Sequence, residues 1–191
     1  MMEVLQQYQH LLKLDQIESF NYGLCTNMKH AIQVLNGSEA LVKKLRRDVK
    51  SVLSINSRNA TLEQRFIEEF FPNVKEIYYT DLKPPPQNPN KVEQLSARDA
   101  LRKYHFADLV LCFFPASSAQ GYSGIISNYF RGRYFIFYGH YDYSSQDDPQ
   151  EEFLDSLSDN LRLIFCRVVG NPFLSNSKDI VVFERIEETK K

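Results

Sequence analysis

The apolar positions in the first part of the chain recur every three or four residues, which is the spacing of one face of an α-helix. The two runs with this spacing are Val4, Leu5, Tyr8, Leu11 and Leu12, followed by Leu24, Met28, Ala31, Ile32 and Leu35. The Asn36-Gly37 pair can end the second helix. Ser38 can then cap a further helix that reaches about Arg47. Because no strand pattern interrupts these runs, we predict an α-helical extension over residues 1–48.

From residue 49 onward, short β-rich runs alternate with helical runs. The strand runs are 49–55, 74–80, 91–95, 107–114 and 133–139, and the helical runs are 61–71, 97–104, 123–130 and 149–157. Strands that are joined through helices pair in parallel, so this alternation predicts a mostly parallel sheet. The last two strand runs, 161–169 and 179–186, are joined by a segment without helical periodicity, which favours an antiparallel hairpin.

This order of elements resembles the Rossmann-like fold of S-adenosylmethionine-dependent methyltransferases, whose sheet also closes with an antiparallel hairpin. The resemblance covers about residues 49–186. It implies a three-layer α/β domain over residues 49–191 with a mostly parallel seven-stranded sheet, preceded by the helical extension 1–48. Three segments carry the local likeness. "VLSINSRNATLE" matches a strand, a G-x-G-x-G turn and a helix, "IYYTDLKP" matches a second strand that ends on an acid, and "ADLVLCFFP" matches a fourth strand that ends near a proline.

The resemblance also implies a set of contacts to S-adenosylmethionine. The glycine positions of the family turn are matched here by Asn56, Arg58 and Ala60, so the loop lacks all three glycines. Asp81 would bind the ribose hydroxyls, although an acid at a strand end before prolines is also an ordinary turn residue. The cofactor residues that the resemblance implies are Asn56, Ser57, Arg58, Asn59, Asp81, Ser96 and Pro115.

Two functions remain open at this point. Glycines let the backbone approach the cofactor because they carry no Cβ, and their loss favours a methyltransferase-like protein with a degenerate cofactor site, a pseudoenzyme that binds or scaffolds other proteins. Retention of Asp81 favours the alternative, an active S-adenosylmethionine-dependent methyltransferase with a divergent loop. Phe114 stands where amino-group methyltransferases carry Asp, Asn or Ser, so the sequence assigns no catalytic residue.

Charge changes the picture only locally. The net charge of −1 gives no overall field that would attract nucleic acid, so a nucleic-acid partner is not indicated. Residues 43–50 nevertheless carry a local charge of +4, whereas residues 141–160 hold seven acids and no base. Such runs are usually solvated surface. The functional alternative is a protein interface formed by Lys43, Lys44, Arg46 and Arg47.

Other classes of function find no support in the sequence. The four histidines are far apart and no Cys or His pair has ligand spacing, so we expect no metal site. The chain has no phosphate-binding G-x-x-x-x-G-K-[ST] motif. Its apolar runs are too short to span a membrane, and its start lacks the pattern of a signal peptide. Cys112 and Cys166 lie in apolar runs, which favours reduced thiols and a cytoplasmic protein, with the nucleus as the alternative.

Overall fold

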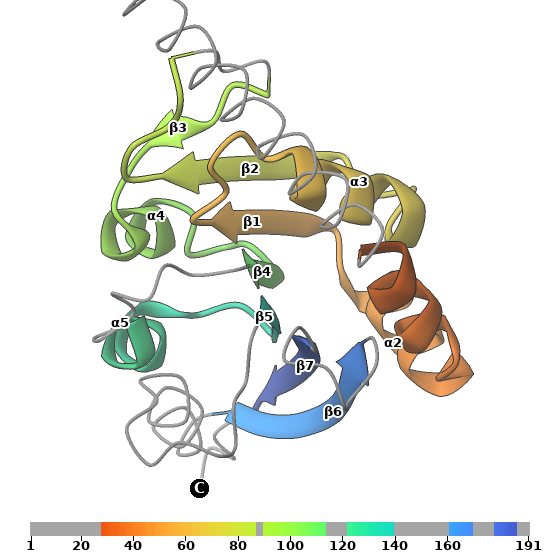
Figure 1. The fold of residues 1–191 in the computed structure, drawn as a ribbon. Coiled ribbons are helices and arrows are strands. Elements are labelled where there is room, and N and C mark those ends of the chain that lie inside the picture. Colours follow the sequence, from red (N-terminus) through yellow and green to blue (C-terminus); the bar gives the residue numbers. More distant parts are fainter. Residues whose placement is uncertain (1–27, 87–89, 114–121, 140–160, 170–177, 187–191) are drawn as a thin grey trace, which may run out of the picture.

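The structure is a computed structural model that describes residues 28–86, 90–113, 122–139, 161–169 and 178–186. Residues 28–36 are helical, and the later helices are α2 (Glu39–Asp48), α3 (Thr61–Phe70), α4 (Ala97–Lys103) and α5 (Tyr122–Tyr129). The strands are β1 (Ser51–Ile55), β2 (Glu76–Asp81), β3 (Glu93–Gln94), β4 (Leu109–Phe113), β5 (Tyr134–Gly139), β6 (Leu161–Val169) and β7 (Lys178–Arg185) (Figure 1). The predicted helices over residues 4–12 and 149–157 lie outside the described residues.

The seven strands form one sheet in the order β3-β2-β1-β4-β5-β7-β6. The first five strands in this order pair in parallel, and β7 pairs antiparallel with both β5 and β6. The predicted parallel sheet and its closing hairpin are therefore confirmed. The parallel strands begin at one edge of the sheet, here called the amino edge, and end at the opposite edge, here called the carboxyl edge.

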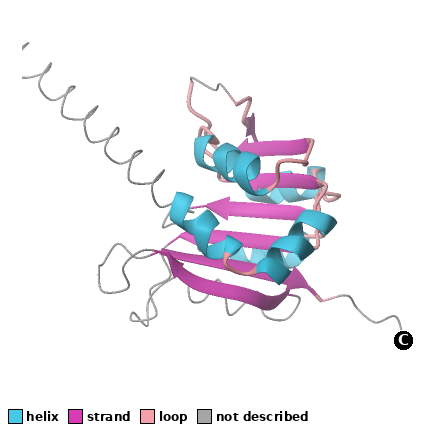
Figure 2. Cartoon of the chain, turned by 90° about the vertical axis from the view of Figure 1, so that its right-hand side faces the viewer, coloured by secondary structure: helices cyan, strands magenta, loops and turns pink. Residues whose placement is uncertain are grey.

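Helices cover both faces of the sheet, which makes the predicted three layers (Figure 2). The side chains of β4 point alternately to the two faces of the sheet and pack against the helices on each. Leu109, Leu111 and Phe113 belong to the cluster with α2 and α3, whereas Val110 and Cys112 belong to the cluster with α4 and α5. All five side chains are buried. A strand that is covered on both sides reads as a continuous apolar run, which is why this one was legible in the sequence.

The described helices before β1 share the core of the sheet. Met28, Leu35, Leu41 and Leu45 are buried in the same cluster as the side chains of α3. Their spacing places one apolar stripe against the sheet and leaves the opposite side polar. The division of the chain at residue 48 stays a prediction, and residues 28–48 pack in one core with α3 and the central strands.

Strand β3 is shorter than the sequence predicted, with two residues in place of five. Within the described residues it pairs with β2 at two positions, Thr80 with Glu93 and Asp81 with Gln94. It lies at the end of the sheet beside β2 and comes after the proline-rich segment 82–90, and the length of a strand with one neighbour depends on the contacts that this neighbour offers. The strand at this end of the sheet is therefore the shortest one described, whereas the longest strands, β6 and β7, lie at the opposite end.

Candidate functional site

The loop between β1 and α3 adopts a backbone that glycine normally favours. Asn56, Arg58 and Ala60 have φ angles of 59°, 50° and 58°, in the left-handed region. These are the three positions that the sequence matched to the glycines of the cofactor turn. A residue with a Cβ pays roughly 1 kcal/mol or more in this region, and asparagine pays less than most. The turn thus takes left-handed conformations without glycines, and the surrounding contacts must hold it.

Backbone hydrogen bonds from β2 and within the loop supply that support. The amide of Ser57 donates to the carbonyl of Thr80 at 3.0 Å, and the amide of Ala60 donates to the carbonyl of Ser57 at 2.5 Å. The side-chain amide of Asn90 donates to the carbonyl of Asn59 at 2.7 Å. Contacts from two other segments therefore fix this loop at the carboxyl edge.

Asp81 lies at the end of β2 and binds the same loop. One carboxylate oxygen accepts the amide of Arg58 at 2.9 Å, and the other accepts the amide of Lys83 at 2.7 Å. The turn role that the residue type suggested is thereby observed. Each oxygen keeps a second lone pair, so the ribose contact stays a prediction. Arg58 and Asn59 are both exposed, so the long side chain of Arg58 reaches solvent.

Glu63 is the residue at this edge that the sequence analysis missed. It lies in the first turn of α3, only 4% of it is exposed, and burial raises the pKa of its carboxyl from 4.5 to about 8. The charge of Asp81 raises this pKa further, whereas Arg58 and the backbone N–H of Glu63 lower it. Its position three residues before Phe66 and four before Ile67, on the apolar face of the helix, was the available signal.

Two serines beside this loop are buried as well. The hydroxyls of Ser54 and Ser57 have no hydrogen-bond partner within the part of the chain that the structure describes. Ser54 is fully buried, and 2% of Ser57 is exposed. Burying a hydroxyl without a partner costs on the order of 1–3 kcal/mol. Buried polar groups without compensation are therefore concentrated at the carboxyl edge.

Cys112 on β4 is no nucleophile in this setting. Its side chain is buried, and burial raises the pKa of its thiol to about 12. The nearby carboxyl of Glu63 raises the pKa in the same direction. The reactive form of cysteine is the thiolate, so this thiol stays unreactive at neutral pH.

The other two predicted cofactor residues are Ser96 and Pro115. Ser96 is the N-cap of α4, where its hydroxyl accepts the amide of Asp99 at 3.2 Å and donates to the carboxylate of Asp99 at 2.6 Å. Its contact to adenine stays a prediction beside this structural role. Pro115 lies outside the described residues.

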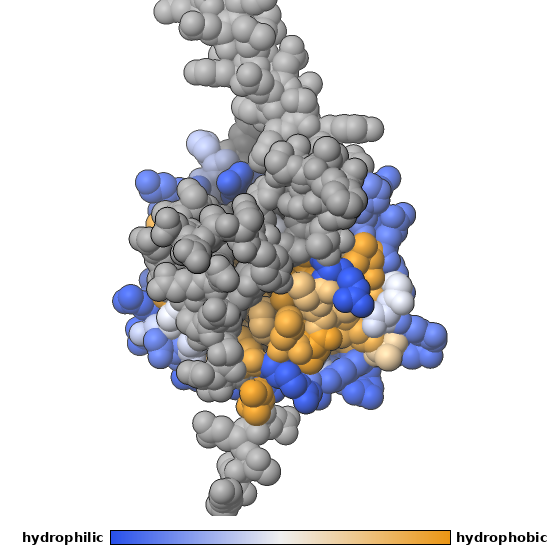
Figure 3. Space-filling view, turned by 60° about the horizontal axis from the view of Figure 1, so that its bottom comes forward, coloured by the Kyte–Doolittle hydropathy of each residue, from blue (hydrophilic) through white to orange (hydrophobic). Residues whose placement is uncertain are grey.

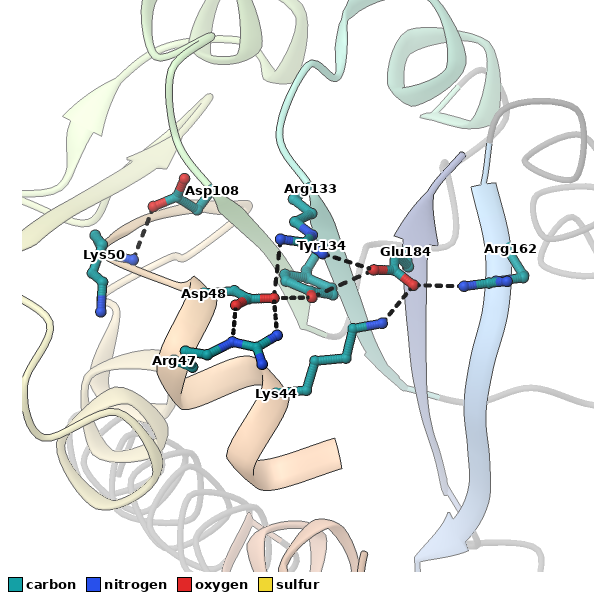
Figure 4. A network of polar contacts seen from close by, with 9 residues as sticks. All are labelled: Lys44, Arg47, Asp48, Lys50, Asp108, Arg133, Tyr134, Arg162 and Glu184. Carbon is teal, nitrogen blue, oxygen red and sulfur yellow. Dashed lines mark hydrogen bonds and ion pairs between the residues drawn. The ribbon is translucent and has the colours of Figure 1, made fainter. Parts of the chain in front are cut away.

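The amino edge carries a network of charged residues built around two carboxylates (Figure 4). Glu184 on β7, which is 7% exposed, accepts from Lys44 at 2.7 Å and from Arg162 at 2.8 Å, and lies 3.4 Å from Arg133. Burial alone would raise the pKa of this carboxyl. The hydrogen bonds from Lys44 and Arg162 outweigh burial and hold the pKa below its ordinary value.

Asp48 at the end of α2 is the second carboxylate of this network. It accepts from Arg47 at 2.7 Å and from the hydroxyl of Tyr134 at 2.7 Å, and Arg133 lies 3.0 Å away. The hydrogen bond from Arg47 is the main reason that the pKa of Asp48 falls to about 2. Arg133 contacts both carboxylates, so α2, β5 and β7 are tied together at this edge (Figure 4).

All four basic residues that were predicted to meet a partner have contacts within the chain. Besides Lys44 and Arg47, Lys43 pairs with Glu39 at 2.5 Å, and Arg46 donates to the carbonyl of Phe70 at 2.8 Å. The side chains of Lys43 and Arg47 are nevertheless 74% and 72% exposed. These two present charge to the outside, and the partner role of all four residues stays a prediction.

Metal ligands and membrane spans are missing from the part of the chain that the structure describes. Over the described ranges, no group of three or more His, Cys, Asp or Glu side chains lies close enough to hold a metal ion. The helices in those ranges are all too short or too polar to cross a membrane.

Comparisons with known proteins show which solved structures share this fold. No family model and no curated protein matches the sequence. The structure of the N-methyltransferase NodS from Bradyrhizobium japonicum WM9 is similar with a TM-score of 0.55 and 11% identity, over 80% of this chain and 96% of that one. The 1,6-didemethyltoxoflavin-N1-methyltransferase of Burkholderia thailandensis, solved with S-adenosylhomocysteine, is similar with a TM-score of 0.54 and 13% identity, over 95% of this chain and 90% of that one.

A third solved structure matches over a similar length. The magnesium protoporphyrin IX methyltransferase of Synechocystis PCC 6803, solved with S-adenosylmethionine, has a TM-score of 0.52 and 12% identity, over 82% of this chain and 80% of that one. At identities this low, the likeness shows a shared fold and nothing more specific.

Proposed function

We propose, from the premise that this chain has the Rossmann-like fold of S-adenosylmethionine-dependent methyltransferases, that it is a non-catalytic binding or scaffolding protein whose cofactor site is degenerate. The observation that carries this proposal is the hydrogen bond from the amide of Arg58 to Asp81. In this fold the carboxylate would bind the ribose hydroxyls, whereas here each of its oxygens already accepts a backbone amide, from Arg58 and from Lys83, which leaves one lone pair on each oxygen for a ribose.

The side chains of the loop support the same conclusion. Asn56, Arg58 and Ala60 carry Cβ atoms at the positions where glycines would let the backbone come close to the cofactor. The carboxyl of Glu63 is buried and largely neutral, and the charges of Arg58 and Asp81 both affect its pKa. A loop that is supported by its own chain has less need of a ligand to order it.

The alternative is an active methyltransferase, and one observation favours it. The three left-handed residues stand at the positions that the resemblance matches to the glycines of the cofactor turn, and they are held there at a cost in backbone strain. Strain of this kind often persists where function needs it. In that case S-adenosylmethionine would bind Asp81 and the backbone of residues 56–59, with a methyl-acceptor that the geometry does not identify.

Calorimetric titration with S-adenosylmethionine and S-adenosylhomocysteine separates the two functions. We expect no binding at millimolar ligand for the natural chain. A variant with Asn56→Gly, Arg58→Gly and Ala60→Gly removes the three Cβ atoms and should gain binding if they are the obstacle. Saturable binding by the natural chain that Asp81→Ala weakens would instead establish the active alternative.

We propose that the partner of the scaffolding form contacts the basic surface of Lys43, Lys44, Arg46 and Arg47. The test uses Lys43 and Arg47, whose side chains are 74% and 72% exposed, and because Arg47 also pairs with Asp48, urea unfolding first checks that the variant folds. Lys43→Glu with Arg47→Glu should abolish capture of the partner in a pull-down. The matched control is Lys75→Glu with Arg102→Glu, two exposed bases elsewhere on the surface. Equal capture by both variants would remove this surface from the proposal.

A further inference from the structure

Three arginines from distant parts of the sequence meet at the amino edge of the sheet. Arg47 lies in the last turn of α2, Arg133 comes just before β5, and Arg162 is the second residue of β6. Arg47 contacts Asp48, Arg162 contacts Glu184, and Arg133 contacts both carboxylates (Figure 4). These five residues form a continuous series in which arginines and carboxylates alternate, here called the arginine row.

The two kinds of charge in the arginine row differ in exposure. The two carboxylate side chains are only 8% and 9% exposed, whereas the side chains of Arg47, Arg133 and Arg162 are 72%, 45% and 66% exposed. The guanidinium groups therefore lie at the surface, and the carboxylates lie beneath them. Three positive charges accompany two negative ones, so this surface is positive although the whole chain has a net charge of −1.

The arginines keep hydrogen-bond donors for an acceptor from outside. A guanidinium group has five N–H donors in one plane. Within the described residues, Arg162 contacts Glu184 through one nitrogen, Arg133 contacts each carboxylate through one nitrogen, and Arg47 contacts Asp48 through two. Each arginine of the row therefore has N–H groups that the two carboxylates do not use.

The carboxylates also hold the arginines in place. A ligand that fixes a free arginine side chain reduces its conformational entropy, which weakens binding. Here Arg133 is held 3.0 Å from Asp48 and 3.4 Å from Glu184, and Arg162 is held 2.8 Å from Glu184. Part of this entropy has therefore been lost on folding, before any ligand binds. Donors that are ordered in this way are preorganised for an anion.

A structural role explains only some of this charge. The helix dipole favours bases in the last turn of a helix, which accounts for Arg47. Arg133 and Arg162 belong to no helix. The positive charges of Lys44 and Arg47 alone would neutralise the two carboxylates that they contact. Arg133 and Arg162 thus exceed what the charge balance of the network requires.

Apolar side chains near this row narrow the class of partner. Ile164 and Phe165 follow Arg162 on β6 and are only partly buried against the core. Figure 3 turns the lower side of the molecule, where β6 lies in Figure 1, toward the viewer and shows apolar residues gathered there beside hydrophilic ones. The phosphates of a nucleic acid would use only the charges. A protein segment that carries acidic and apolar residues can use both.

We propose that Arg47, Arg133 and Arg162 bind the carboxylates of an acidic segment of a protein partner. This inference rests on the proposed scaffolding function and names the chemistry of its partner. The incoming carboxylates accept from the guanidinium N–H groups that Asp48 and Glu184 leave unused. Such charge-assisted hydrogen bonds between arginine and carboxylate are short and often bidentate, so the row recognises the planar shape of a carboxylate as well as its charge.

The test measures binding of a labelled oligoglutamate peptide to the full chain by fluorescence anisotropy at low salt. Arg162→Gln removes one guanidinium of the row and should weaken binding by roughly tenfold or more. The matched control is Arg167→Gln, because Arg167 is an exposed arginine of the same strand toward its other end. The control should change the affinity by less than about twofold, since salt screens distant charges. Equal affinities of the two variants would overturn the proposal.

Two further measurements separate carboxylate recognition from general attraction between charges. Arg162→Lys keeps the charge but loses the planar fork of donors, so it should recover only part of the affinity. Full recovery would overturn the proposal. Tighter binding of a single-stranded oligonucleotide of equal charge, with the same dependence on Arg162, would also overturn it. Lys44 and Arg133 stay beside Glu184 in these variants, so they should fold, and urea unfolding checks this.

The outcomes remain distinct from those of the proposed function. Partner capture that depends on Lys43 and Arg47 but not on Arg162 would keep the basic surface of that proposal and overturn its extension to the arginine row. Saturable binding of S-adenosylmethionine, together with loss of peptide binding in Arg162→Gln, would overturn the scaffolding function and support the anion site.

Discussion

The two edges of the sheet treat buried carboxyl groups in opposite ways. At the amino edge, Asp48 and Glu184 are surrounded by lysine and arginine side chains, and the pKa of each is lowered. At the carboxyl edge, Glu63 forms no ion pair with any residue in the described ranges, and its pKa rises to about 8. The paired carboxylates of the amino edge hold helices and strands together. A buried carboxyl without an ion pair, such as that of Glu63, lowers stability, and such groups are typical of functional sites.

The largest effect should come from breaking the amino edge. Glu184→Gln removes the carboxylate that Lys44, Arg133 and Arg162 share. Loss of one partner from a buried ion pair costs about 3–5 kcal/mol. Because Arg133 and Arg162 are 45% and 66% exposed, we expect about 2 kcal/mol here. Urea unfolding measures it, and Glu39→Gln, which breaks only an exposed pair, should cost under about 0.5 kcal/mol.

Glu63→Gln should have the next largest effect and the opposite sign. Between pH 4.5 and about 8 the folded chain keeps a proton on Glu63 that the unfolded chain releases, so stability falls as pH rises through this window. Glutamine does not ionise and removes this fall. At pH 8 the variant should be the more stable of the two, by an amount that shrinks as the pH falls, and at pH 4.5 the two should be nearly equal.

The measurement is urea unfolding at several pH values. Glu69→Gln serves as the control, because it makes the same chemical change at an exposed glutamate of the same helix. A Glu63→Gln profile that runs parallel to that of the natural chain would contradict the assignment of Glu63 as a buried neutral carboxyl.

Ser96→Ala separates a structural serine from a ligand contact at the carboxyl edge. Its hydroxyl caps α4, and loss of such a cap costs about 1 kcal/mol. Ser38 is the matched control, because it stands at the N-cap of α2 without a side-chain hydrogen bond. Ser38→Ala should therefore cost clearly less than Ser96→Ala on the same urea curves, because no side-chain hydrogen bond is lost. Equal costs would show that the cap is not what Ser96 contributes.

The smallest effect concerns the strain in the loop itself. Ala60→Gly removes the Cβ from a left-handed residue, which should stabilise the folded state by roughly 1 kcal/mol. Glycine also gives the unfolded chain more conformational entropy, which offsets part of this gain. A net gain of about 0.5 kcal/mol should result. Ala100→Gly inside α4 should instead lose about 1 kcal/mol. A loss at both positions would mean that Ala60 is not strained in solution.

Much of the fold could be predicted because its signals are local. The run from Leu109 to Phe113 is apolar throughout, and a strand covered on both faces requires that composition. The closing hairpin was legible because the segment between its strands has no helical spacing. The length of β3 was overestimated because edge strands depend on what their neighbours offer.

The site was harder to predict because its signals are distant in the sequence. Nothing near Arg58 shows that its amide meets Asp81, and nothing near Lys44 shows that it meets Glu184, a residue 140 positions away. The left-handed turn at Asn56 and Ala60 depends on such contacts and not on local preference. Glu63 did carry a local signal, because its position falls on the apolar face of a helix. Its charged side chain, which normally indicates an exposed residue, hid that signal.

The place of β7 between β5 and β6 has a consequence for synthesis on the ribosome. β5 finds no partner on that side until residues 178–185 have emerged, although it is complete at residue 139. At about 5–20 residues per second, an open edge of six buried residues therefore waits for seconds. Such an edge can pair with other nascent chains. The interval between β5 and β7 is thus the period in which this chain most needs protection from aggregation.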